Sequence, residues 1–242
     1  MTSLLVDIGA TSFKWTYGDN ESWERARRRA TPKPATPERI VEMTAQRALR
    51  RECSTISVGF PGEVRDGVVI DGANLVRSGG PSSPRDAGLD AAWRDFDLAG
   101  ALREAAGIPT VVTNDAHATA YGCDVRAQRS LVVVLGTGCG VGFIEGGELV
   151  RIRDYGDDVI DNLTLDQLVG EEMRRLGHAQ WLAHCNKTIA YLVSELTPDA
   201  VYVAGGNAGR LRPSDISQDV AVELVRGEPA FRGLMRLTPR AI

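Results

Sequence analysis

Residues 4–15 read LLVDIGATSFKW, and residues 135–150 read LGTGCGVGFIEGGELV. Each stretch places a glycine-rich turn between two runs of apolar and β-branched residues, which is the pattern of a strand, a tight turn and a second strand. The second turn opens into a strand and not into a helix, so it does not meet the context of a dinucleotide-binding fingerprint. Because the pattern recurs about half a chain apart, the sequence predicts two similar lobes around a central cleft.

Further strands and helices alternate around these two hairpins. Short β-rich runs predict strands at residues 4–8, 13–17, 56–60, 110–113, 131–135, 141–144 and 201–204. Start and stop signals predict helices after Thr36-Pro37, from Asp97 to Gly107, from about Thr164, and from about Gln180 to Leu196. Strands that alternate with helices indicate an α/β fold. We expect the lobes to comprise residues 1–112 and 113–242.

The composition excludes several classes of protein. A formal net charge of −4 leaves no overall basic character for nucleic acid, and the basic run Arg25–Arg29 is short enough to be a solvated strand face. No apolar run approaches the roughly 20 residues of a membrane helix, and Asp7 comes too early for the core of a signal peptide. The four cysteines form no CxxC pair, so free buried thiols are expected and zinc is not. We therefore expect a soluble, cytoplasmic protein without a nucleic-acid or membrane partner.

The first glycine turn carries candidate phosphate-binding residues. Asp7 ends a strand, Gly9 and Thr11 form the turn, and Lys14 follows in the next strand. Backbone N–H groups of such a turn can face phosphate oxygens, Thr11 or Lys14 can donate to a phosphate, and Asp7 can hold Mg²⁺ through water. A plain β-turn with Asp7 as a local hydrogen-bond acceptor is the alternative.

Two later glycine turns have similar properties. Gly136, Thr137 and Gly138 begin the second hairpin, where missing side chains let the backbone approach a polyphosphate. Gly205 and Gly206 follow an apolar strand and can leave room for an adenine or a ribose. A tight or bulged hairpin and a loop with unusual backbone angles are the respective alternatives.

Asn114-Asp115 lies where an apolar strand ends and a helical stretch begins. Ligands gather at the carboxyl ends of strands in α/β sheets, and a carboxylate there can take the proton of a hydroxyl nucleophile. An ordinary helix N-cap is the alternative, because Asn and Asp are favoured at that position.

The order of these elements resembles that of the ROK family of sugar kinases, and within it the short branch that includes polyphosphate/ATP glucokinases. LLVDIGATSFKW is similar to the family's first phosphate loop and LGTGCGVGFIEGGELV to its second. VGFPGEVRDGVV with GANL resembles its Pro-Gly segment and sugar loop, VVTNDAHATAYG its catalytic Asn-Asp element, and VYVAGGNAG its nucleotide-side turn.

The resemblance implies a two-lobed actin-like ATPase fold, related to ribonuclease H, that binds Mg²⁺ and ATP or polyphosphate. It assigns the catalytic base to Asp115 and contacts with the sugar to Asn114, Asn74 and Gly62. The long loop after Asn74, GGPSSPRDAGLDAAW, is then a candidate lid over the acceptor. A homodimer is common among similar proteins.

One departure from the family pattern concerns the acceptor. Family glucokinases carry a Glu-x-Gly-His element after the second phosphate hairpin, whereas LVRIRDYGDDVIDN stands here without histidine. Either Asp154, Asp157 or Asp158 replaces those acceptors, or the acceptor is a different polyol or cyclitol. The leading hypothesis is a sugar-type kinase. The alternatives are a sugar- or nucleotide-binding regulatory module that has lost turnover, and an actin-like ATPase without a small acceptor.

Overall fold

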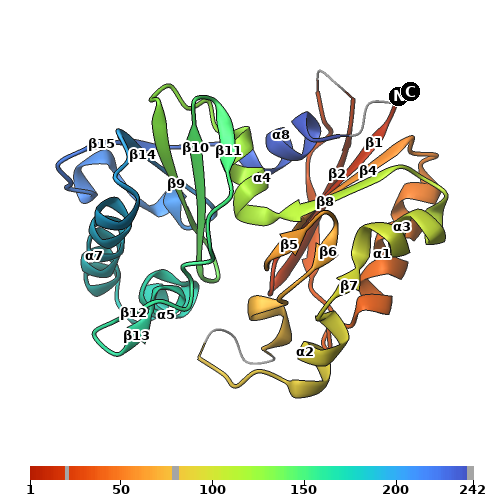
Figure 1. Cartoon of the computed structure of the whole chain (residues 1–242), viewed down its shortest axis with the longest axis horizontal. Coiled ribbons are helices and arrows are strands. Elements are labelled where there is room, and N and C mark those ends of the chain that lie inside the picture. The colour runs from red at the N-terminus through yellow and green to blue at the C-terminus, as the bar shows by residue number, and fades with distance from the viewer. Residues whose placement is uncertain (20–21, 78–81, 239–242) are drawn as a thin grey trace. The chain divides into compact units, whose positions relative to one another are not determined.

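The computed structural model describes residues 1–19, 22–77 and 82–238 and divides into two compact units. Unit 1 comprises Met1–Ala118 and the chain from Ala230 onward, and unit 2 comprises Thr119–Pro229 (Figure 1). The division falls inside helix α4 (Asp115–Gly122), a few residues after the expected boundary, which lies within strand β8 (Thr110–Asn114). Asp115 therefore belongs to unit 1 and not to the later unit.

Unit 1 is built on a five-stranded sheet of order β3-β2-β1-β4-β8. The first hairpin supplies β1 (Ser3–Ile8) and β2 (Ser12–Gly18), and β3 (Arg27–Ala30) pairs antiparallel with β2. β4 (Thr55–Phe60) and β8 follow β1 in parallel. The carboxyl ends of β1, β4 and β8 therefore lie at one edge of the sheet, where α/β folds gather ligands.

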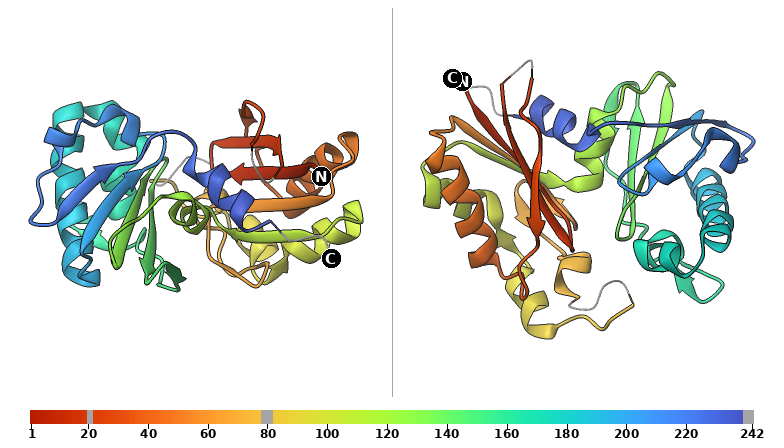
Figure 2. Two further views of the ribbon diagram at one scale, coloured as in Figure 1. Left: turned by 90° about the horizontal axis from the view of Figure 1, so that it is seen from above. Right: turned by 180° about the vertical axis from the view of Figure 1, so that it is seen from behind.

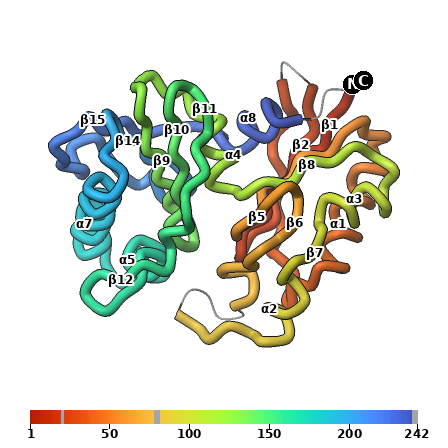
Figure 3. Tube along the Cα trace, viewed as in Figure 1, coloured from red at the N-terminus to blue at the C-terminus, as the bar shows by residue number. Residues whose placement is uncertain are grey.

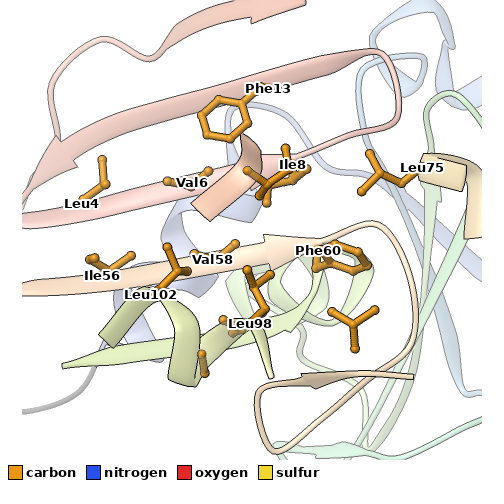
Figure 4. Close-up of a cluster of buried hydrophobic side chains, with 14 of the residues drawn as sticks. Leu4, Val6, Ile8, Phe13, Ile56, Val58, Phe60, Leu75, Leu98 and Leu102 are labelled. Carbon is orange, nitrogen blue, oxygen red and sulfur yellow. The ribbon is translucent and has the colours of Figure 1, made fainter. Parts of the chain in front are cut away.

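Helices α1 (Pro37–Arg50) and α3 (Leu98–Ala106) cover one face of this sheet (Figure 2). Thr36 caps α1 and Asp97 caps α3 with side-chain oxygens, and α3 ends at Gly107 in the left-handed conformation. Figure 4 shows the core beneath them, where alternate residues of β1 and β4 meet the apolar side of α3. The sequence signals for both helices are confirmed.

Smaller elements complete unit 1. A three-stranded meander consists of β5 (Val64–Arg65), β6 (Val68–Val69) and β7 (Phe96–Asp97). The 3-10 helix η1 (Ala73–Val76) and α2 (Ala87–Trp93) lie between β6 and β7 in the chain. On the opposite face of the sheet, Leu5 packs with Ala118 of α4 and with Phe231 and Leu234 of α8 (Pro229–Arg236).

Unit 2 repeats the same sheet pattern, with order β11-β10-β9-β14-β15 (Figure 3). β9 (Arg129–Leu135), β10 (Cys139–Glu145) and β11 (Glu148–Val150) are antiparallel neighbours, and Gly146-Gly147 forms the tight turn between β10 and β11 at positive φ. β14 (Ala200–Ala204) and β15 (Ala221–Leu224) continue in parallel from β9. The repeat expected from the two glycine hairpins is confirmed.

Helices pack on both faces of this second sheet. α5 (Leu165–Val169), α6 (Glu171–Leu176) and α7 (His178–Leu196) contribute to the larger core, and Thr164 caps α5 with a capping box. Cys123 and Ala120 of the α4 segment pack with Tyr202 on the other face. The remaining short elements are β12 (Val159–Ile160), β13 (Leu163–Thr164), η2 (Ala208–Arg210) and η3 (Pro213–Asp215).

Several further expectations can be compared with the structure. All four cysteines are buried free thiols, as expected. The first three residues of the candidate lid, 79–81, lie outside the described residues. Among the helices of the described chain, none combines the length and apolarity needed to cross a membrane.

Each unit contains one fully buried tryptophan that donates its indole N–H to a backbone carbonyl. Trp93 Nε1 lies 2.8 Å from Ala35 O, and Trp181 Nε1 lies 2.8 Å from Val169 O. Trp93→Phe and Trp181→Phe keep an aromatic ring but leave the carbonyl without its donor, which costs about 1–3 kcal/mol. We expect each variant to lower the free energy of unfolding by that amount in guanidinium titrations. Leu49→Ala, at a half-exposed position, is the control, and a Trp variant no less stable than it contradicts the assignment.

Candidate functional site

A row of side chains crosses one face of the unit 1 sheet. Leu4, Val6 and Ile8 face the α1 core, so Asp7 points to the opposite face because side chains alternate along a strand. The strand register aligns Asp7 with Lys14 on β2 and with Gly59 on β4. Lys14 Nζ lies 2.7 Å from Asp7 Oδ2 in an ion pair. The predicted acidic and basic residues of the first turn are thus direct neighbours.

Asp115 begins α4 directly beside this row. A Cβ built on Gly59 would lie 3.3 Å from the Cα of Asp115 and 3.6 Å from its Cβ. Only a glycine on β4 lets the first turn of α4 approach so closely without displacement. Since Gly59 is also the register partner of Asp7, the carboxyl groups of Asp7 and Asp115 start from adjacent positions on the same face.

Asn114 holds two segments together. Its Oδ1 accepts a hydrogen bond from His117 N at 3.0 Å, which caps α4, and its Nδ2 donates to Gly62 O at 2.9 Å. Asn114 therefore performs the helix-capping role that the sequence left open for the Asn-Asp pair. Its amide keeps a second N–H for a ligand, so contact with an acceptor is compatible with both bonds.

The first glycine turn is pinned by β-strand neighbours. Gly9 N donates to Ser12 O at 2.9 Å, and Thr31, just after β3, reaches back to Gly9 O at 2.6 Å through its hydroxyl. Thr31 N also donates to Thr11 O. Thr11 itself is exposed at the tip of the turn. Thr31 was not predicted, because its role depends on the pairing of β2 with β3.

The segment that contains Asn74 packs against the Pro-Gly turn. A side chain at Gly62 would collide with the backbone carbonyl of Asp71, so these two backbones touch. Asp71 Oδ1 accepts from Ala73 N, and Asn74 follows in η1 with its side chain half-buried. Gly62, Asn74 and Asn114 thus belong to one connected group in unit 1.

The second glycine turn, in unit 2, is organised by a carboxylate that sequence reasoning missed. Asp166 Oδ1 accepts from Cys139 N at 2.7 Å, and a Cβ on Gly138 would collide with the same carboxylate. Asp166 N donates to Gly156 O at 3.0 Å. Burial, together with the charges of Asp166 and Asp154, raises the pKa of the Cys139 thiol, which therefore stays neutral.

The nucleotide-side turn lies beside the second glycine turn within unit 2. Gly205 has φ +94° and its α-hydrogen faces the backbone of Leu135, so a glycine is required there by conformation and by space. Gly206 and Gly136 have nothing within 4 Å of a built Cβ. Asn207, also not predicted, donates from Nδ2 to Gly136 O at 2.9 Å and so links the two turns.

The three aspartates proposed as hydroxyl acceptors differ in their surroundings. Asp158 is held by Arg153 and by the Tyr191 hydroxyl, and hydrogen bonds from Arg153 hold the pKa of Asp158 below its usual value. Asp154 Oδ1 accepts from Gly156 N at 2.9 Å. Asp154 and Asp157 are exposed. Asp158 is thus held in an ion pair with Arg153.

The donor atoms fit a phosphate-bound magnesium ion better than an ion held by protein alone. Within residues 1–19, 22–77 and 82–238, no group of three or more His, Cys, Asp or Glu side chains is placed to hold a metal. Mg²⁺ typically uses one or two carboxylates and completes its shell with waters and substrate phosphates. Asp7 can supply one such carboxylate beside the first glycine turn.

The comparison with known proteins agrees with this geometry. A family model described as the ROK family matches residues 3–153, which is more than half of the chain. The chain belongs to the ROK family. The matched range includes the Asp7 row, the Gly62 and Asn74 segments, Asp115 and the second glycine turn.

Two relatives are 27% and 31% identical to this chain over aligned segments of 157 and 155 residues. An N-acetylmannosamine kinase of Escherichia fergusonii is 27% identical over 157 residues, covering 62% of this chain and 50% of that protein. A glucokinase of Streptomyces coelicolor is 31% identical over 155 residues, covering 60% of this chain and 44% of that protein. The chain spans about half the length of these curated relatives.

Solved ROK structures match over nearly the whole chain. An inorganic polyphosphate/ATP-glucomannokinase from Arthrobacter sp. strain KM gives a TM-score of 0.78 at 24% identity, covering 98% of this chain and 97% of that one. A ROK family glucokinase from Streptomyces griseus, in complex with glucose and AMPPNP, gives 0.72 at 19% identity, with 98% and 99% covered. The α/β actin-like ATPase fold expected from the sequence is therefore confirmed.

The double role of Asn114 can be separated by mutation. Asn114→Ala removes the cap of α4 and the donor to Gly62, whereas Asn114→Ser keeps a capping oxygen and loses only the donor to Gly62. Loss of a side-chain cap costs about 1 kcal/mol, and a lost hydrogen bond costs a similar amount. We expect Asn114→Ala to destabilise the protein about twice as much as Asn114→Ser in urea unfolding without added ligand. Equal unfolding midpoints for wild type and Asn114→Ala would show that neither hydrogen bond contributes to stability.

Proposed function

We propose that this ROK protein transfers a phosphoryl group from ATP or polyphosphate to a hydroxyl of a sugar or a sugar-like polyol. The observation that carries the proposal is the position of Asp115, which begins α4 against Gly59 and next to Asp7. A carboxylate at the carboxyl end of a parallel strand, beside a glycine turn suited to phosphate, has the arrangement that phosphoryl transfer to an alcohol needs.

In this proposal Asp115 acts as the base. One of its carboxylate oxygens accepts the proton of the acceptor hydroxyl. At the same time the hydroxyl oxygen forms a bond to the terminal phosphorus of the donor. The bond between this phosphorus and the bridging oxygen of the donor breaks, and ADP or a shortened polyphosphate leaves. Little further covalent chemistry is required of the protein, so positioning and charge neutralisation supply the rest of the rate enhancement.

The first glycine turn serves the donor phosphates. Backbone N–H groups near Gly9 and Thr11 and the ammonium of Lys14 donate to phosphate oxygens, and Asp7 would hold Mg²⁺ through water. Mg²⁺ bound there would neutralise charge on the donor phosphates. Lys14 pairs with Asp7 at 2.7 Å in the ligand-free protein, so it is already held at the edge of this turn. Gly136, Thr137 and Gly138 have the corresponding role in unit 2, where Gly205 and Gly206 leave room for an adenine or a ribose of the donor.

The acceptor is proposed to be a polyhydroxylated molecule that need not be glucose. Asn74, Gly62 and Asn114 form the connected group next to Asp115 to which we assign the binding of hydroxyls. Asp154 and Asp157 remain the candidates in unit 2 in place of the missing Glu-x-Gly-His element. Asp157 supports this assignment because it is exposed, whereas Asp158 is engaged by Arg153.

A phosphoryl-transfer screen tests the proposal. The protein is incubated with Mg²⁺, with ATP or polyphosphate, and with a panel of sugars, amino sugars and cyclitols, and ³¹P NMR follows the products. We expect a new phosphomonoester signal that depends on one class of acceptor. Ligand binding by calorimetry without any phosphomonoester favours the regulatory module, and release of inorganic phosphate unaffected by every acceptor favours the ATPase.

The base assignment predicts the behaviour of one substitution. Asp115→Asn keeps the size of the side chain and removes the proton acceptor, so we expect kcat to fall by about 10²–10⁴-fold. Calorimetry should show acceptor binding retained within a few-fold. Glu104→Gln, an exposed carboxylate on α3, is the matched control and should leave kcat unchanged. Turnover by Asp115→Asn at the wild-type rate would remove Asp115 from the mechanism.

A further inference from the structure

Arg85 joins Asp71, in the segment of residues 71–77 that carries Asn74, to helix α2. Its Nη2 lies 3.0 Å from each carboxylate oxygen of Asp71, and its Nε lies 3.1 Å from Asp90 Oδ1, which Nη2 also contacts. Asp90 belongs to α2 and accepts a further bond from Arg94 at 2.7 Å. A single guanidinium thus links two carboxylates that lie on different segments.

This group is a partly buried network of ion pairs and not an isolated surface pair. The side chains of Arg85 and Asp90 are 28% and 22% exposed, that of Asp71 is 43% exposed, and that of Arg94 is 62% exposed. A guanidinium has donors in a fixed planar fork, which suits it to hold two carboxylates at a set separation. Hydrogen bonds from Arg85 first, and then from Arg94, hold the pKa of Asp90 below its ordinary value, so Asp90 is charged at neutral pH.

Asp71 connects Arg85 to the candidate site. Its carbonyl packs against Gly62, whose own carbonyl accepts the Nδ2 bond of Asn114, the residue before Asp115. Its carboxylate accepts from Ala73 N, and Ala73 adopts φ +42°, a conformation that a residue with a side chain rarely takes without support. Asn74 follows immediately, so its position depends on how Asp71 is held.

The other end of this segment, at residues 76 and 77, is also held by bonds to the chain near Arg85. Arg77 and Arg85 form an isolated antiparallel bridge, and Asp86 N donates to Val76 O at 2.8 Å. Arg77 Nη1 additionally contacts Ser83 O. Residues 71–77, which we term the acceptor segment, are therefore fastened at both ends to the chain around Arg85.

We propose that Arg85 is a positioning residue that sets the acceptor segment, and through Gly62 the amide of Asn114, in the geometry that accepts the polyol hydroxyl. The proposal rests on the proposed function, because it deepens the acceptor side of that reaction. Arg85 does not touch the reacting atoms. It acts through Asp71, and its loss releases the segment that carries Asn74 while leaving the first glycine turn, and hence the donor phosphates, unaffected.

The test compares Arg85→Met, Arg85→Lys and Arg94→Met, each checked for folding by circular dichroism. Arg94→Met is the matched control, because Arg94 contacts Asp90 but shows no bond to Asp71. With the acceptor found in the screen, we expect Arg85→Met to lower kcat/KM for the acceptor by ten- to a hundredfold, since small misplacements have such effects. The KM for the donor should change less than twofold. Arg85→Lys keeps the charge without the fork, so it should recover only part of the loss.

A second measurement requires no substrate. Hydrogen–deuterium exchange followed by mass spectrometry reports the amides of residues 71–77, including the Ala73 N–H that Asp71 accepts. We expect at least tenfold faster exchange there in Arg85→Met and wild-type exchange in Arg94→Met. Unchanged exchange, or equal losses of acceptor and donor kcat/KM, overturns the proposal for Arg85. If the wild-type protein phosphorylates no acceptor, the proposed function fails, and the exchange result alone decides whether Arg85 positions this segment.

Discussion

The first turn of α4 lies so close to β4 that a side chain on the strand residue facing Asp115 would push α4 away by a few tenths of an ångström. A methyl group at Gly59 would sit 3.3 Å from the Cα of Asp115, which is tighter than ordinary van der Waals contact in a packed interior. This contact sets the height of Asp115 above the sheet and its separation from Asp7, the register neighbour of Gly59. Asn114 holds this approach in place, because it caps α4 and binds Gly62 O.

Hydrogen bonds and backbone packing connect the start of α4 to Gly62, Asp71 and Arg85. Asn114 caps α4 and binds Gly62, Gly62 packs on Asp71, and Arg85 holds Asp71 against α2. Unit 2 uses a similar device on its own glycine turn, where Asp166 takes the place of a side chain at Gly138 and binds Cys139 N. In both units a glycine lets a polar group from a later segment approach the backbone. In unit 1 Gly62 contacts the carbonyl of Asp71, and in unit 2 Gly138 contacts the carboxylate of Asp166.

Local sequence signals were sufficient for most of the fold. Apolar runs located the central strands, Thr36, Asp97 and Thr164 marked helix starts, and the paired glycine hairpins revealed the repeat. Local signals could not predict contacts between residues that are distant in the sequence. The return of α8 to unit 1 depends on apolar packing with Leu5, and the roles of Arg85, Asp166 and Asn207 depend on register and on neighbours distant in sequence. Asn114-Asp115 illustrates this limit of local signals. The sequence allows either residue to cap α4, whereas the structure gives the cap to Asn114.

The most direct test of the central claim is the turnover number of Gly59→Ala compared with Gly177→Ala. Gly177 is extended and has nothing within 4 Å of a built Cβ, so alanine there adds a methyl group without displacing a neighbour. Steady-state phosphoryl transfer with the acceptor found in the screen should show kcat at least tenfold lower for Gly59→Ala, with donor binding retained, because Asp115 is displaced from its working position. Gly177→Ala should retain the wild-type kcat. A folded Gly59→Ala protein with the wild-type kcat would contradict the claim that this approach positions the base.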